Sequence, residues 1–250
     1  FILIMNKILL LIIICLSFLF CLIYFSKHFE FINKTKLFKI LSHKDYLNTF
    51  SKIDLYVRNV NNTEEYIKYK IVHSLSDFNI FEKLRLFCLT LYVDISIFLS
   101  KSNSINKTKL IQIPWKIGVV NGKLYEEGLP HTRNGNIILS RNSLNNNSNK
   151  ELAKILLHEK VHVYQYIYKD ETQKYIEKKG FKKLRKREKN VRANPDIDLY
   201  TYMDSSGNKY RATYRKNASS ILDVKYDAGN SQSYEHPYES MAIELEKIIN

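Results

Sequence analysis

The chain has 250 residues, and 45% of them are hydrophobic, which is typical of a folded protein and excludes an intrinsically disordered one. The 39 Lys and Arg against 25 Asp and Glu give a net charge of +14. Lys, Asn, Ile and Tyr are abundant together, as in proteins from AT-rich genomes, so the charge is a weak functional signal and we do not expect a nucleic-acid partner. Only Cys88 lies outside the first apolar stretch, which excludes a disulfide framework and a cysteine-held zinc.

The first apolar stretch predicts contact with lipid. From Ile8 to Phe25 the chain has 18 residues without a charge, about the minimum for a membrane span. A cleaved signal peptide would have a shorter apolar region and a small-x-small site, which "CLIYFSKHF" lacks. We expect residues 1–28 to be an uncleaved, single-pass membrane anchor. The alternatives are a cleaved segment, which would make the protein secreted, and a buried core helix.

The side of the membrane stays open. Lys7 precedes the stretch while Lys27, Lys34 and Lys36 follow it, which places the body in the cytosol by the positive-inside rule. Five N-x-S/T sequons favour the other side, but a chain so rich in Asn contains several by chance.

Residues 29–110 have a helical pattern. In "NNTEEYIKYKIVHSL", Asn62 stands three residues before Glu65 and predicts a helix cap. "FNIFEKLRLFCLTLYVDISIFLS" has apolar residues at helical spacing, and Glu82 and Asp94 indicate that it packs against protein instead of crossing a bilayer.

From residue 111 strands and helices are mixed. Asn121-Gly122 between "KIGVV" and "KLYEE" predicts a two-residue hairpin, and "NIILS", 136–140, predicts a short strand. Ser148, three residues before Glu151, predicts a capping box at the start of "NKELAKILLHEKVHVYQYI".

The last part of the chain begins with a basic run between Lys178 and Arg192. We interpret it as a solvated helical face or loop, with binding of anionic lipid or nucleic acid as the alternative. Two or three strands around a turn at Ser206-Gly207 and a helix starting near Pro237 complete the prediction.

His158 and His162 stand four residues apart on the predicted helix, so both imidazoles can reach one cation. Glu159 is turned by about 100° toward the edge of that cation. Zn²⁺ lowers the pKa of bound water, and a carboxylate that is not a ligand can take the proton and pass it to a leaving amine. The alternative is a core helix with two hydrogen-bonded histidines.

The residues "LLHEKVH" resemble the signature helix of the zincin metallopeptidases. The resemblance implies a zinc cofactor, His158 and His162 as its ligands, Glu159 as general base and a peptide or protein substrate. In that superfamily a strand bordering the cleft precedes this helix and pairs with extended substrate, and "NIILS" has the corresponding place.

A catalytic zinc needs a third protein ligand and one open position. "EHPYESMA" offers Glu239 followed by Ala242, which is similar to the E-x-x-A arrangement of gluzincins, where a small residue lets two helices approach. Glu239 is therefore the expected third ligand, although 76 residues separate it from His162, a long interval for a simple gluzincin. The alternatives are Asp196, Glu235 and His236, whose carboxylate or imidazole groups can also bind zinc.

A group is also needed to stabilise the oxyanion of a tetrahedral intermediate. Tyr238, Tyr234 and His236 are candidates near the third ligand, and His131 and Arg133 are candidates before the expected cleft strand. We expect His131 and Tyr238 to take part in catalysis.

These patterns predict an α+β fold with three parts: a membrane anchor or signal segment at 1–28, a helical region at 29–110, and a zincin-like metallopeptidase domain at 111–250. The expected function is hydrolysis of peptide bonds by one zinc ion. The alternatives are an inactive zincin-fold binding protein and a basic protein that binds membranes or nucleic acid.

Overall fold

The structure is a computed structural model, which describes residues 5, 12, 28–102 and 104–249. Apart from three positions, the anchor expected at 1–28 lies outside the described residues. In the described part of the chain no helix is both long and apolar enough to cross a membrane.

A mixed sheet forms the centre of the molecule. Its strand order is β1-β3-β5-β4, with a fifth strand, β2 (Leu75–Ser76), paired to the end of β3. β3 (Trp115–Val120) runs parallel to both β1 (Phe29–Phe31) and β5 (Asn136–Ser140), whereas β4 (His131–Arg133) runs antiparallel to β5. Every residue of β5 is buried, as expected for a strand covered on both faces.

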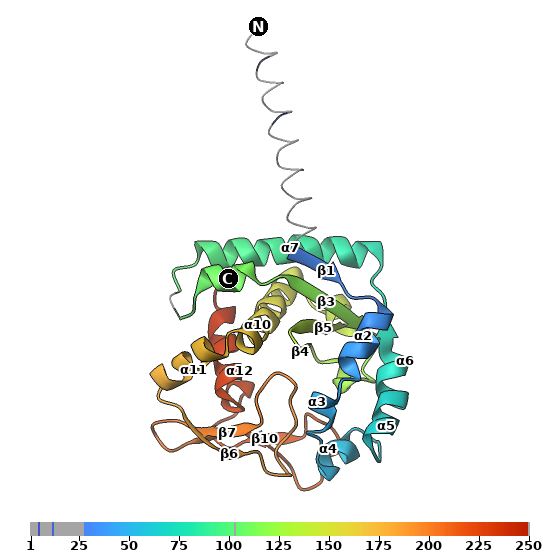
Figure 1. Ribbon diagram of the computed structural model, residues 1–250, viewed down its shortest axis with the longest axis vertical. Helices are drawn as coiled ribbons and strands as arrows, with labels where there is room; N and C mark the ends of the chain where they lie inside the picture. Colours follow the sequence, from blue (N-terminus) through green and yellow to red (C-terminus); the bar gives the residue numbers. More distant parts are fainter. Residues whose placement is uncertain (1–4, 6–11, 13–27, 103, 250) are drawn as a thin grey trace.

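The sheet has a helical layer on each face. Ile117 and Val119 of β3 point into a core with three long helices, α7 (Ile80–Leu99), α10 (Asn149–Ile167) and α12 (Pro237–Glu246). Side chains on the other face pack against α2 (Lys34–Leu41) and the short helices after it (Figure 1). Those helices are α3 (Lys44–Leu47), α4 (Lys52–Val57), α5 (Thr63–Glu65), η1 (Tyr66–Ile71) and α6 (Val72–Ser74).

The expected fold class, α+β with an N-terminal transmembrane helix, needs correction. The structure has a mixed α/β fold with small sheets, and parallel pairing of β1, β3 and β5 places residue 29 and residue 138 in one sheet. The described residues provide no membrane-crossing helix. Local periodicity could not predict the pairing of β1 with β3, because it joins segments more than 80 residues apart in sequence.

The hairpin predicted at Asn121-Gly122 is wrong. Gly122 has the positive φ that such a turn needs, at 63°. However, β3 ends at Val120 and already pairs with β1 and β5 along its sides, so the following "KLYEE" forms a turn and the 3₁₀ helix η2 (Glu126–Gly128). The chain then returns through β4, which is the edge strand in place of the expected β5.

Other local predictions are confirmed. Ser148 and Glu151 form the capping box of α10, Asn62 caps α5, and Pro237 is in the first turn of α12. The remaining helices are α8 (Lys107–Gln112), α9 (Arg141–Asn146) and α11 (Lys169–Lys178).

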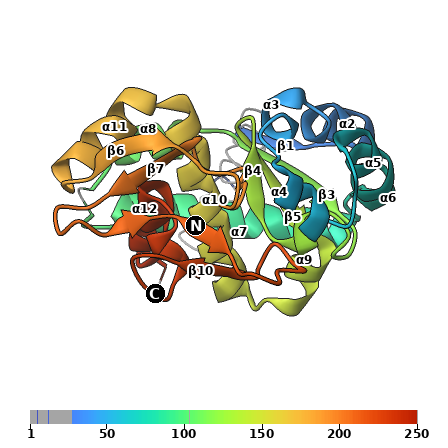
Figure 2. The same ribbon diagram turned by 90° about the horizontal axis from the view of Figure 1, so that it is seen from below.

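The last third of the chain forms two small sheets, which lie below the central sheet in Figure 1 and are viewed from that side in Figure 2. One contains β6 (Lys182–Lys186), β7 (Tyr200–Met203) and β8 (Lys209–Tyr210), and the other β9 (Ala212–Tyr214) and β10 (Val224–Tyr226). The basic run is therefore part strand and part loop: Lys182–Lys186 form the edge strand β6, and residues 187–192 continue mainly as a loop, in which Arg192 is buried. All five residues of β6 are exposed, as predicted for a solvated segment.

Candidate metal centre

His158 and His162 lie on the same side of α10, and their Nε2 atoms are 3.0 Å apart. The Nδ1 of His158 donates to Glu246 Oε1 at 2.7 Å, and the Nδ1 of His162 donates to Gln165 Oε1 at 2.7 Å. With both Nδ1 atoms protonated, two Nε2 lone pairs face each other, which is unfavourable unless a cation or a shared proton lies between them.

Glu239 supplies a carboxylate to the same point from the first turn of α12. Its Oε2 lies 3.3 Å from His158 Nε2 and 3.7 Å from His162 Nε2. Ligand atoms around a tetrahedral zinc, with bonds of about 2.0–2.1 Å, are separated by about 3.3–3.4 Å. The three observed separations bracket that value, so the donor set fits a zinc ion. Ala242 is fully buried where α12 packs on α10, which permits this close approach.

Close contacts determine the ionisation of Glu239 and His158. Burial opposes ionisation of Glu239, but His162 and His158 outweigh it and hold the pKa of that carboxyl well below its ordinary value. Burial also opposes protonation of His158, but hydrogen bonds with Glu239 and Glu246 raise its pKa well above the ordinary value. These shifts favour positive charge on the imidazole side of the group and negative charge on Glu239.

A second layer of hydrogen bonds orients the carboxylate of Glu239. Asn194 donates to its Oε1 at 3.0 Å, and Gln232 donates to its Oε2 at 2.8 Å. Gln165, which receives the His162 hydrogen bond, donates in turn to the backbone carbonyl of Tyr238 at 3.0 Å. These contacts fix the ligand rotamers, as outer-shell partners do in metal proteins.

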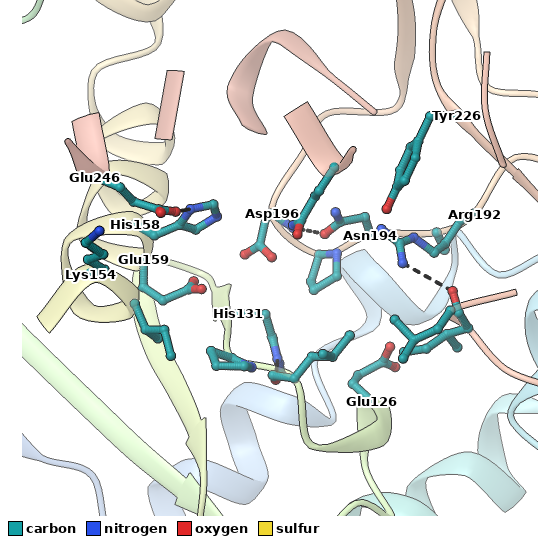
Figure 3. Close-up of a pocket in the computed structure, with 18 residues that line it drawn as sticks. Glu126, His131, Lys154, His158, Glu159, Arg192, Asn194, Asp196, Tyr226 and Glu246 are labelled. Carbon is teal, nitrogen blue, oxygen red and sulfur yellow. Dashed lines mark hydrogen bonds and ion pairs between the residues drawn. The ribbon is translucent and has the colours of Figure 1, made fainter. Parts of the chain in front are cut away.

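Glu159 lies beside the three side chains without joining them. It is 3% exposed, and Figure 3 shows its carboxylate pointing from α10 into a cavity of about 270 Å³. The hydroxyl of Thr132, on edge strand β4, donates to Glu159 Oε2 at 3.1 Å. Burial raises the pKa of Glu159 to about 7, against the opposing effect of His158. A carboxyl of this kind can accept and return a proton near neutral pH.

A loop crosses the cleft in front of Glu159. Asn194, Pro195 and Asp196 line both the 270 Å³ cavity and a second cavity of about 330 Å³, so the loop separates the two. The carboxylate of Asp196 accepts the backbone N–H of Thr132, which β4 would otherwise offer at its free edge. Burial and then the charge of Glu159 raise the pKa of Asp196 well above its ordinary value.

The other candidate ligands lie apart from this centre. Asp196 is not one of the residues whose ligand atoms converge. Glu235 is paired with Arg192 at 3.1 Å. His236 caps α12 and has its Nε2 3.1 Å from Asp198 Oδ1.

The side chains of His131 and Tyr238, two candidates for stabilising the oxyanion, contact other protein groups. His131 lines the first cavity, but its Nδ1 contacts the Leu129 carbonyl at 2.9 Å and its Nε2 contacts the Tyr125 hydroxyl at 3.2 Å. Tyr238 lines the second cavity, and its ring packs edge-on against His236 at 4.6 Å between centroids.

The two remaining oxyanion candidates also have structural contacts. Arg133 is buried over the ring of Tyr46. Tyr234 lies in η3 (Gln232–Tyr234) next to the ring of Tyr210.

Sequence reasoning missed several residues of the site. Gln165 follows His162 by one helical turn, and Glu246 follows Glu239 by two, so helical spacing contained a signal for both. Thr132, Asn194 and Gln232 lie on a short edge strand or at irregular segments, where no periodicity marks them.

One comparison with known families matches this part of the chain. Residues 98–201 match the SprT-like family. The SprT-like family belongs to the zincin-like metallopeptidase clan, and the matched residues run from the end of α7 through β3, β5 and α10 to the start of β7. The SprT-like match ends before Glu239 and does not extend to the third candidate ligand. Comparisons with curated proteins and with solved structures found no match.

Proposed function

We propose that this protein hydrolyses peptide bonds with one zinc ion held by His158, His162 and Glu239. The observation that carries the proposal is the convergence of two imidazole nitrogens and one carboxylate oxygen beside a buried, unligated glutamate. The SprT-like segment supports it, because its clan contains metallopeptidases. The proposed two-histidine, one-glutamate donor set is of the gluzincin kind.

Glu159 is the proposed general base. Zinc, when bound, supplies the Lewis acidity that activates water and polarises a carbonyl. The Glu159 carboxylate would then accept the proton of the attacking water and deliver it to the departing amine. Thr132 holds this carboxylate at the cavity wall through the 3.1 Å hydrogen bond, so no rotation is needed before proton transfer.

Edge strand β4 is the proposed site for an extended peptide. It is an edge strand of the central sheet and contacts α10, so a peptide paired there would cross in front of Glu159. In the structure the backbone N–H of Thr132 donates to Asp196. The loop with Asn194 and Pro195 therefore has to shift before a peptide can pair with all of β4. Neither ring nitrogen of His131 is free to donate to a substrate, so we leave His131 out of the proposed reaction.

The test compares the full chain with its Glu159→Gln variant. We expect about one zinc per chain in both by elemental analysis, and cleavage of a mixed peptide library by the unsubstituted chain alone. Glu64→Gln, at an exposed glutamate, is the matched control and should cleave normally. Equal cleavage by the Glu159→Gln variant would exclude the mechanism. Zinc binding with no cleavage by any form would indicate an inactive zincin-fold binding protein.

A further inference from the structure

The outer face of α7 is apolar along its whole length. Its exposed side chains recur every three or four residues, so they form one stripe on the helix. We call this set the α7 stripe: Ile80, Phe81, Leu84, Cys88, Tyr92, Ile95, Phe98 and Leu99. Phe81 is 80% exposed, Phe98 72% and Leu99 71%, which are large values for such side chains.

The four charged residues of α7 have contacts outside the stripe. The Nζ of Lys83 lies 5.7 Å from the centre of the Phe31 ring on β1. Glu82 accepts a hydrogen bond from Arg141 at 2.9 Å, and Asp94 is buried beside Lys160 on the inner face. Arg85 donates to Asn149 at 2.9 Å. The stripe is therefore a continuous apolar surface about 30 Å long, given the 1.5 Å rise per residue. A surface of this kind marks contact with a partner protein or with lipid.

The first described strand, β1, lies beside α7. β1 starts at Phe29, and the ring of Phe29 lies 6.3 Å from that of Phe87 on α7. Figure 1 shows β1 alongside α7 at one edge of the molecule. The sequence from Ile8 to Phe25, 18 residues without a charge, precedes this point closely. The uncharged sequence 8–25 therefore precedes, by a few residues, a strand that lies beside α7.

The α7 stripe and residues 8–25 cannot remove all of each other's apolar side chains from water. The sequence of residues 8–25 is apolar except for Ser17 and Tyr24, so it contains more apolar side chains than the α7 stripe alone could cover. Lipid acyl chains can cover both. An exposed basic side chain, Lys101, also follows the end of α7, whereas Lys34 near the start of α7 is paired with Asp77 at 4.0 Å. A lysine at the position of Lys101 attracts anionic headgroups.

We propose that the α7 stripe docks on a lipid bilayer, lying in the interface without crossing it. Crossing is excluded for α7 itself, because it contains four charged residues and is not a candidate span. The stripe is separate from the metal centre, so the proposal does not depend on peptide hydrolysis.

Cys88, in the middle of the stripe, allows a direct test with the full chain. We would replace Cys15 and Cys21 with serine, attach a polarity-sensitive dye to Cys88 and reconstitute the protein in phosphatidylcholine vesicles with and without phosphatidylglycerol. Quenching by lipids brominated in their acyl chains reports contact with the bilayer, and quenching by iodide reports contact with water. The control carries the dye at Tyr56→Cys on α4, 67% exposed, with Cys88 also replaced by serine.

We expect brominated lipid to quench the dye at Cys88 and iodide not to, with the reverse at position 56. In a Phe81→Ser, Leu84→Ser, Phe98→Ser variant, iodide quenching at Cys88 should return to the level at position 56. Iodide quenching of Cys88 in the unsubstituted stripe would overturn the proposal, because the body would then be tethered without docking. Protection from both quenchers would also overturn it, because residues 8–25 or a second copy would then cover the stripe.

Discussion

Glu246 accepts a 2.7 Å hydrogen bond from Nδ1 of His158 and so orients this imidazole toward Glu239. Glu246 lies on α12, as Glu239 does, so one helix provides both a proposed ligand and the group that orients another proposed ligand. The two helices therefore have to keep their register for the metal centre to exist.

The first prediction concerns this orienting contact. Glu246→Ala should weaken zinc binding by about 10- to 100-fold, because the imidazole loses its fixed tautomer and direction. Competition with a chromogenic chelator measures the affinity. Glu246→Gln keeps an acceptor oxygen and should recover most of it. Unchanged affinity in the alanine variant would show that Glu246 is only a surface neighbour of His158.

A buried ion pair gives the second prediction. Lys160 on α10 donates to Asp94 on α7 at 2.7 Å, and Trp115 donates to the same carboxylate at 3.0 Å. Lys160→Met would leave a buried carboxylate without its cation, which costs about 3–5 kcal/mol of the free energy of unfolding. Urea denaturation measures the loss. Adding Asp94→Asn should restore part of the stability, and a double variant no better than Lys160→Met would contradict this account.

The metal helix was predictable because its signals are local. Ser148 and Glu151 set the start of α10, and four-residue spacing then fixes where His158 and His162 point, whatever the rest of the chain does. Glu239 was also accessible, since Pro237 marks the start of its helix and a small residue follows one turn later.

The cleft was not predictable in the same way. β4 has three residues, and its strand character depends on pairing with β5 instead of on its own pattern. Asn194 reaches Glu239 from a loop whose path is fixed by buried partners far along the chain, including Asp54, which accepts the backbone N–H of Ala193. No local spacing in the sequence encodes such contacts.

Thr132 gives the third prediction. Thr132→Val keeps the shape of the side chain but removes the hydroxyl that donates to Glu159. We expect kcat for peptide cleavage to fall by roughly ten- to a hundredfold, because the carboxylate is no longer held in place, while zinc content stays the same. Thr132→Ser should retain activity. If the valine variant loses its zinc instead, the hydroxyl supports the metal centre and not the base.

The last prediction concerns acid sensitivity. Burial lowers the pKa of His131 from 6.5 to about 4, although the Leu129 carbonyl and Glu126 act in the opposite direction. Between these two pH values the unfolded chain binds a proton that the folded chain does not, so this histidine makes stability fall as pH falls from 6.5 toward 4. The loss amounts to about 3 kcal/mol at the lower limit.

His131→Gln removes this titration, so the difference in unfolding free energy between the variant and the unsubstituted chain should shrink as pH falls through that window. Glutamine can still donate to the Leu129 carbonyl, which limits the cost near pH 7. Urea denaturation at a series of pH values gives the two curves. Acidic groups remote from His131 titrate in both proteins and cancel in the difference. Parallel curves across the window would mean that His131 is protonated in the folded protein as readily as in the unfolded one.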